Sequence, residues 1–201
     1  MKQPVSEHPA GQPIGALSEN RDWRHPLWLA LLVAASVVFR LGLACAVPLA
    51  AFAAAAALSL SRRDALLLIV LVWLANQLVG FTLLGYPRDV STFAWGAVLG
   101  VVAILATLAG QWTAGRLANT RRAFTATATL LVAFTVYEAA LFPASATLLG
   151  GTEIYTAAIQ GRIFAINAPA FIGLLALHRL ASSAGLATTL MAVRATREQH
   201  A

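Results

Sequence analysis

The sequence is short of charged residues. Asp, Glu, Lys and Arg make up 11% of its 201 residues, against about 25% in a typical soluble domain. The few charges bunch between long apolar runs, 59% of the residues are hydrophobic and the mean hydropathy is +0.75. These features exclude a soluble globular domain. They predict an all-α, polytopic membrane helix bundle in contact with a lipid bilayer.

Cysteine, histidine pairs and catalytic motifs are also scarce. Cys45 is the single cysteine, so neither an internal disulfide nor a cysteine-based metal cluster can form. The sequence contains no HExxH, GxSxG or GxxxxGK[ST] motif, and no histidine pair in the apolar runs suits a bis-imidazole haem. We therefore expect no enzyme activity, no cofactor, no metal and no ATP hydrolysis by the chain itself.

The basic residues are distributed as topology signals. The net charge is +6 and the isoelectric point is about 10.7, but the basic residues flank apolar blocks instead of forming a basic patch interleaved with aromatics. This pattern does not indicate a nucleic-acid partner. Residues 1–22 are polar and contain three prolines, which predicts a disordered cytoplasmic tail. Residues 181–201 form a second predicted cytoplasmic tail, and 23–180 the transmembrane domain.

Four apolar runs have the length of a membrane span, which needs about 20 residues. They are residues 64–84, 93–114, 123–142 and 162–180. A fifth run, 26–60, would make a helix of roughly 52 Å at about 1.5 Å per residue, far longer than the ~30 Å hydrocarbon core. Either one helix overshoots the bilayer, or two short helices turn near "RLGLACAVP".

The basic residues favour two helices there, and hence six transmembrane helices. With six spans and both termini cytoplasmic, the outer side carries only Arg40, Arg88 and Arg162. The inner side then carries Lys2, Arg21, Arg24, Arg62, Arg63, Arg116, Arg121, Arg122, Arg179, Arg194 and Arg197. With five spans, the side of every basic residue after position 60 is reversed. The positive-inside rule therefore predicts six spans.

Polar side chains gather in the outer half of the predicted spans. Asn76, for example, lies about 18 Å from the inner edge of a ~30 Å core. The inner half contains mainly Ala, Leu, Val and Thr. This asymmetry predicts a polar pocket that opens to the outer side above an apolar floor. The candidate pocket residues are Arg40, Asn76, Gln77, Tyr86, Trp95, Tyr137, Glu138, Arg162 and Asn167.

The side-chain chemistry of this set predicts a small, partly aromatic solute. The three aromatic residues would stack on a ring, and the three amides would hydrogen-bond it. Arg40 or Arg162 would meet an anionic group, and Glu138 a cationic group or a donor.

Each of these residues also has a structural interpretation that the sequence leaves open. The arginines can snorkel to the headgroups, the aromatics can belong to the interfacial belt, and adjacent amides can bridge helices for about 0.6 kcal/mol. Glu138 can form a structural pair with Arg40 or Arg162, a pairing we favour for the empty protein. Asn167 with Pro169 can mark a helix kink.

Small residues repeat at four-residue spacing in two of the predicted helices. Ala30 and Ala34 lie in the inner half of the first helix, and Gly96 and Gly100 lie in the fourth. Pairs with this spacing permit close approach between helices. We therefore expect the first helix to present a smooth face on which a partner helix can dock.

The helix number, the chain length, the outward pocket and the AxxxA pair together resemble the substrate-binding (S) components of energy-coupling factor transporters. These are small bacterial inner-membrane proteins that capture vitamins or related micronutrients from the outer side. The resemblance implies that Ala30 and Ala34 contact a separate transmembrane coupling subunit, and that two partner ATPases power uptake. It covers roughly residues 23–180 and concerns architecture, because no substrate-specific motif is recognised.

Two other functions fit the same composition. A structural or assembly subunit of a membrane complex would bury the same polar groups between helices and would have no transport role. A proton-coupled carrier would usually show inverted repeats and interrupted helices, and the sequence contains no convincing repeat.

The six-span topology can be tested by cysteine labelling. In a Cys45→Ser background, Arg62→Cys and Arg88→Cys should lie on opposite sides of the membrane. A membrane-impermeant maleimide added to intact cells should label position 88 and spare position 62. Labelling of both positions from one side would contradict six spans.

Overall fold

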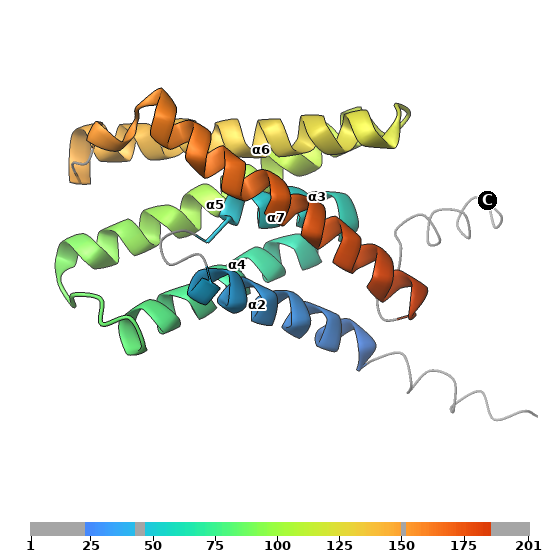
Figure 1. The fold of residues 1–201 in the computed structure, drawn as a ribbon, viewed down its shortest axis with the longest axis horizontal. Coiled ribbons are helices and arrows are strands. Elements are labelled where there is room, and N and C mark those ends of the chain that lie inside the picture. Colours follow the sequence, from blue (N-terminus) through green and yellow to red (C-terminus); the bar gives the residue numbers. More distant parts are fainter. Residues whose placement is uncertain (1–22, 43–46, 150–151, 186–201) are drawn as a thin grey trace, which may run out of the picture.

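Six α-helices form a bundle in the computed structural model, which describes residues 23–42, 47–149 and 152–185 (Figure 1). A π-helical turn, η1, and a 3-10 turn, η2, follow the fifth of these helices. In chain order the elements are α2 (Arg24–Gly42), α3 (Leu49–Ser59), α4 (Arg62–Thr82), α5 (Val90–Arg116), α6 (Arg122–Ala144), η1 (Ser145–Leu149), η2 (Thr152–Ile154) and α7 (Ala157–Ser183).

Five of these helices are long and apolar enough to cross a membrane, namely α2, α4, α5, α6 and α7. Their outward surfaces carry many exposed large hydrophobic side chains, as expected of helices in contact with lipid tails. Examples are Leu78, Val101, Ile172 and Leu180. The chain is therefore a multi-pass membrane helix bundle.

The observed helices match the predicted runs. Helices α4 to α7 correspond to the four clear candidate spans, with ends that differ by at most five residues. The long run 26–60 contains two helices, α2 and α3, on either side of residues 43–46. Helix α7 continues to Ser183, past the predicted domain boundary at 180. The predicted N-terminal tail, 1–22, and residues 186–201 of the C-terminal tail lie outside the described residues.

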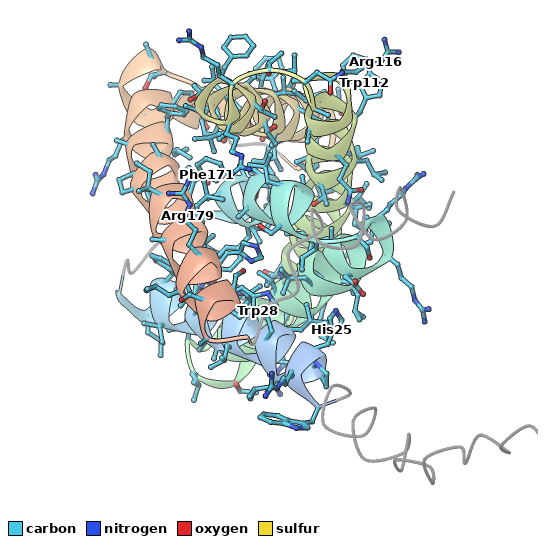
Figure 2. The ribbon with its side chains drawn as sticks, turned by 90° about the vertical axis from the view of Figure 1, so that its right-hand side faces the viewer. His25, Trp28, Trp112, Arg116, Phe171 and Arg179 are labelled. Atoms are coloured by element: carbon cyan, nitrogen blue, oxygen red, sulfur yellow. The ribbon has the colours of Figure 1, made fainter. Side chains whose placement is uncertain are left out.

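Helix α3 lies at the centre of the bundle, and Figure 2, viewed along the bundle, shows the longer helices around it. It contacts α4, α5, α6 and α7. Its sequence, LAAFAAAAALS, has no polar face, and every residue from Leu49 to Ala57 is buried. The alanines keep α3 thin, and Gly110 of α5 lets that helix come close, because an added Cβ would lie 3.1 Å from Ala57 Cβ.

Helix α3 is too short to span the bilayer and begins partway along the bundle (Figure 1). Its 11 residues make about 16 Å, roughly half of a ~30 Å core. A helix that begins there needs partners for its first backbone N–H groups. Asn167 of α7 supplies one: its Oδ1 accepts from Ala51 N–H at 3.0 Å, while its Nδ2 donates to the Ile163 carbonyl at 3.0 Å.

Two contacts bring the described ends of the chain to the same end of the bundle. Arg24 Nη1 donates to the Gly185 carbonyl at 3.2 Å. His25 Nε2 lies 3.4 Å from Asp64 Oδ2, which joins the first turns of α2 and α4. We call the end with Arg24, Asp64 and Gly185 the proximal end. The opposite end, with the last turn of α2 and the α4–α5 connection, is the distal end.

The two small-residue pairs have different surroundings. Ala30 and Ala34 lie on the exposed face of α2, next to exposed Leu31. That face is open to lipid or to a partner helix. Gly96 and Gly100 of α5 are buried and face side chains of α4.

The Asn167 contact should dominate the stability of this region. Asn167→Ala leaves the Ala51 N–H, which is 0% exposed, without its acceptor, and a buried unsatisfied donor costs about 1–3 kcal/mol. We expect a clear fall in the thermal unfolding temperature of the detergent-purified protein. The matched control is Ile172→Ala, on the exposed face of the same helix. Equal losses in both variants would contradict the capping role.

Candidate functional site

A cavity of about 240 Å³ lies at the distal end of the bundle. This is somewhat smaller than the ~300 Å³ at which ligand pockets usually begin, so it suits a compact solute. Six of the nine predicted pocket residues line it: Arg40, Asn76, Gln77, Tyr86, Trp95 and Tyr137. The other lining residues are Val47, Leu49, Trp73, Thr92, Gly96 and Leu99.

The short length of α3 explains why the cavity is there. Leu49, the first residue of α3, and Val47, two residues before it, line the cavity. The rest of α3 fills the centre of the proximal half with apolar side chains. Asn76 and Tyr137 reach the cavity from points about 21–22 Å along α4 and α6. Polar and aromatic side chains therefore line a cavity in the distal half, next to the apolar proximal half that α3 fills.

Asn76 serves both as a link between helices and as part of the cavity wall. Its Nδ2 donates to Ser36 Oγ of α2 at 3.1 Å and to the Val72 carbonyl at 2.7 Å. Its Oδ1 is buried and has no hydrogen-bond partner among the described residues. A buried acceptor without a donor costs about 1–3 kcal/mol. The Asn76 side chain lines the cavity, and this oxygen is its one polar atom without a partner in the described part of the chain.

Trp73 and Gln77 form a second wall of the cavity. The sequence analysis identified Gln77 and missed Trp73. Trp73 Nε1 donates to the Gly96 carbonyl at 2.7 Å. A Cβ added at Gly100 would lie 2.8 Å from Trp73 Cε2, and one added at Gly96 would lie 2.9 Å from Gln77 Oε1. The signal was the matched spacing: two large residues four apart on α4 face two glycines four apart on α5.

The Tyr86 ring and Arg40 meet where α2 ends and the α4–α5 connection begins. Gly85, at φ 64°, has the left-handed conformation that turns the chain back, and Tyr86 N–H then donates to the Gly80 carbonyl at 3.0 Å. The ring packs on Gly80, where an added Cβ would lie 2.6 Å from Tyr86 Cε2. The Arg40 guanidinium lies 5.3 Å from the ring centroid, a cation–π distance.

Among the described residues that line the cavity, Arg40 is the single charged side chain. The nearby Asp89 caps α5, and its carboxylate accepts from Thr92 N–H at 2.7 Å. That hydrogen bond keeps the pKa of the Asp89 carboxyl below its usual value, because it stabilises the charged form. Within the described part of the chain, no three His, Cys, Asp or Glu side chains lie close enough to hold a metal ion.

Three predicted pocket residues do not line the cavity. Asn167 caps α3 through Ala51, so its amide bonds the backbone. Arg162 is exposed on α7. Glu138 is half-buried on α6 and lies near Gln160. Because neighbours on a helix point about 100° apart, the inward direction of Tyr137 turns Glu138 away from the cavity.

The favoured ion pair of Glu138 is also missing. In the part of the chain that the structure describes, Glu138 forms no ion pair with Arg40 or with Arg162. The close contact of a basic with an acidic side chain that the structure does show is His25 with Asp64, at the proximal end.

Comparisons with known proteins found no matching family model, no matching curated protein and no matching solved structure. The likeness to S components of energy-coupling factor transporters therefore rests on helix number, chain length and small-residue spacing. The geometry of the distal cavity has to carry any functional argument.

A pair of glycine variants tests the Trp73 wall. Gly100→Ala should destabilise the protein by about 1–3 kcal/mol, because the Trp73 ring cannot move without breaking its bond to the Gly96 carbonyl. The matched control is Gly173→Ala on α7, which meets nothing within 4 Å and should gain up to about 1 kcal/mol of helix propensity. Thermal unfolding in detergent measures both. A Gly100→Ala protein as stable as the control would show that the wall is loosely packed.

Proposed function

We propose that the chain is an integral membrane subunit that binds a small solute from the outer side in the distal cavity. The observation that carries this proposal is a cavity with aromatic walls that is also lined by Asn76, whose buried Oδ1 has no donor among the described residues. A solute with an N–H or O–H group would remove that unsatisfied acceptor. Ligand sites commonly combine such an apolar lining with a few convergent polar groups.

The orientation of the cavity follows from the helix directions. Helices α2 and α4 both begin at the proximal end, which supports a return of the chain between them and the six-pass topology proposed here. The contact of Arg24 with Gly185 puts both described ends together. Most basic residues belong to this end under the six-pass topology, and the positive-inside rule then favours the cytoplasmic side for it. We propose a bacterial inner membrane as the location. The cavity then opens outward.

The S-component resemblance suggests how bound solute would be taken up. Ala30 and Ala34 are exposed on α2, and small residues on an exposed face permit close approach of another helix. In this proposal they contact a transmembrane coupling subunit, and partner ATPases supply the energy. The bound solute would be vitamin-like in size and chemistry.

A structural subunit is the second candidate, and the bonds of two amides favour it. Asn76 joins α4 to α2, and Asn167 joins α7 to α3. In a purely structural subunit these bonds would be the whole purpose of the polar residues, and the distal cavity would bind nothing.

A cavity-filling variant separates the two candidates. Purified protein would be equilibrated with the small-molecule filtrate of a bacterial lysate, and retained compounds identified by mass spectrometry. Wild type should enrich at least one compound. Leu99→Trp places a large side chain in the cavity wall and should reduce that enrichment by roughly 5- to 150-fold, which corresponds to about 1–3 kcal/mol of overpacking.

The control is Val101→Trp, two residues away on the same helix and 58% exposed to the outside of the bundle. It should retain the compound as wild type does. If no compound distinguishes Leu99→Trp from Val101→Trp, the binding function is refuted and the structural candidate stands.

A further inference from the structure

The two ends of the bundle differ in charge. In the described part of the chain, the proximal end carries seven arginines and a single acidic residue, Asp64. The distal half carries three arginines and three acidic residues, so its charges balance. The arginines of the proximal end are Arg24, Arg62, Arg63, Arg116, Arg121, Arg122 and Arg179. The proximal end is therefore a positive surface that attracts anions.

The positive charge is least compensated at the α5–α6 turn. Arg24 already donates to a carbonyl at the end of α7. Arg62 and Arg63 begin α4 beside Asp64, whose carboxylate offsets part of their charge. The α5–α6 turn carries three arginines, and no acidic residue lies in α5, in the turn or in the first four turns of α6. We therefore expect the positive potential to be greatest there.

Two exposed aromatic side chains accompany the arginines of this turn. Trp112, near the end of α5, is 63% exposed, and Phe124, in the first turn of α6, is 59% exposed. The Arg116 guanidinium lies 5.1 Å from the centroid of the Trp112 ring. Figure 2 shows both residues at the outer edge of the bundle, away from α3. Indole rings are typical of the level where hydrocarbon meets headgroups, so this guanidinium lies at the level of the headgroups.

The order of these groups along the helix axis matches that of a phospholipid. Trp112 lies four residues before Arg116, which places it about 6 Å deeper in the membrane. An acyl chain can pack on Trp112 and Phe124 while the phosphate lies at the arginines. A guanidinium binds two oxygens of one phosphate through paired N–H donors. Arg116 and Arg121 are both exposed, so a headgroup can reach them.

We propose that the α5–α6 turn binds an anionic phospholipid, with Arg116 and Arg121 on the phosphate and with Trp112 and Phe124 against the acyl chains. A soluble phosphate would leave the two exposed rings uncovered. A zwitterionic headgroup brings its own cation, which has no acidic partner at this turn. Clusters of basic residues next to the end of a membrane helix attract anionic lipids in this way. The inference goes beyond the proposed function and requires no solute in the distal cavity.

Lipid binding to the detergent-purified full-length chain tests the proposal. Native mass spectrometry gives the dissociation constant of the first bound lipid, for anionic dioleoylphosphatidylglycerol and for zwitterionic dioleoylphosphatidylcholine. Wild type should bind the anionic lipid at least about tenfold more tightly. In the double variant Arg116→Gln/Arg121→Gln, the dissociation constant of the anionic lipid should rise roughly 30-fold, which corresponds to about 1 kcal/mol for each arginine.

The matched control is Arg62→Gln/Arg63→Gln, which removes the same charge from the same end of the bundle. Its dissociation constant for the anionic lipid should stay within about threefold of wild type, because exposed charges outside the site are screened by salt. Equal weakening in the two double variants would show diffuse attraction without a site and would overturn the inference. Equal binding of the two lipids by wild type would also overturn it and would leave the positive surface to a protein partner.

A fluorescence measurement locates the bound lipid. Bromine atoms on an acyl chain quench the fluorescence of a tryptophan that they contact. Brominated phosphatidylglycerol should therefore quench wild type more than brominated phosphatidylcholine does, and this difference should disappear in Trp112→Phe. Trp112 is 63% exposed, so this change should leave the fold intact. If the difference persists in Trp112→Phe, the anionic lipid is bound elsewhere and the inference fails.

Discussion

The architecture of the bundle depends on the hydrogen bond from Ala51 N–H to Asn167 Oδ1. A helix that begins in the middle of a membrane exposes backbone N–H groups where no water can satisfy them. The Asn167 side chain meets this demand at Ala51 and allows α3 to be half the length of its neighbours. Because α3 begins so deep, the distal half of the bundle has no central helix. The cavity occupies the space that remains.

Asn76 links two helices and, in the proposed function, also contributes to binding. Its Nδ2 holds α4 to α2, whereas its Oδ1 is buried and has no donor among the described residues. A leucine there would pack without a polar cost but would offer a ligand nothing. Rigid attachment through Nδ2 also fixes the position of Oδ1, so a ligand need not order the amide on binding. An amide is suited to this double role because it carries both donors and an acceptor.

The sequence predicts well how deep a residue lies in the membrane, but it predicts poorly in which direction the side chain points from its helix. Length left one long helix or two short ones, and the basic residues favoured the break between α2 and α3. The outward bias of polar residues identified six cavity residues. Facing direction depends on tertiary packing, so Glu138 and Asn167 were assigned to the cavity although they point elsewhere. The alanine run of α3 is apolar all round, which predicts burial but not where the helix begins. Trp73 was overlooked because a tryptophan in an apolar run carries no distinctive signal until its glycine partners are known.

The hydrogen bond between Arg24 and Gly185 brings the start of α2 next to the end of α7. Joining the two ends by a short peptide and reopening the chain at the α5–α6 turn, around residues 117–121, would leave the direction of every helix unchanged. Only the order in which the helices enter the bilayer would differ. Such a permuted chain would show whether α3, which has too few residues to span alone, needs its neighbours already inserted before it can reach the centre.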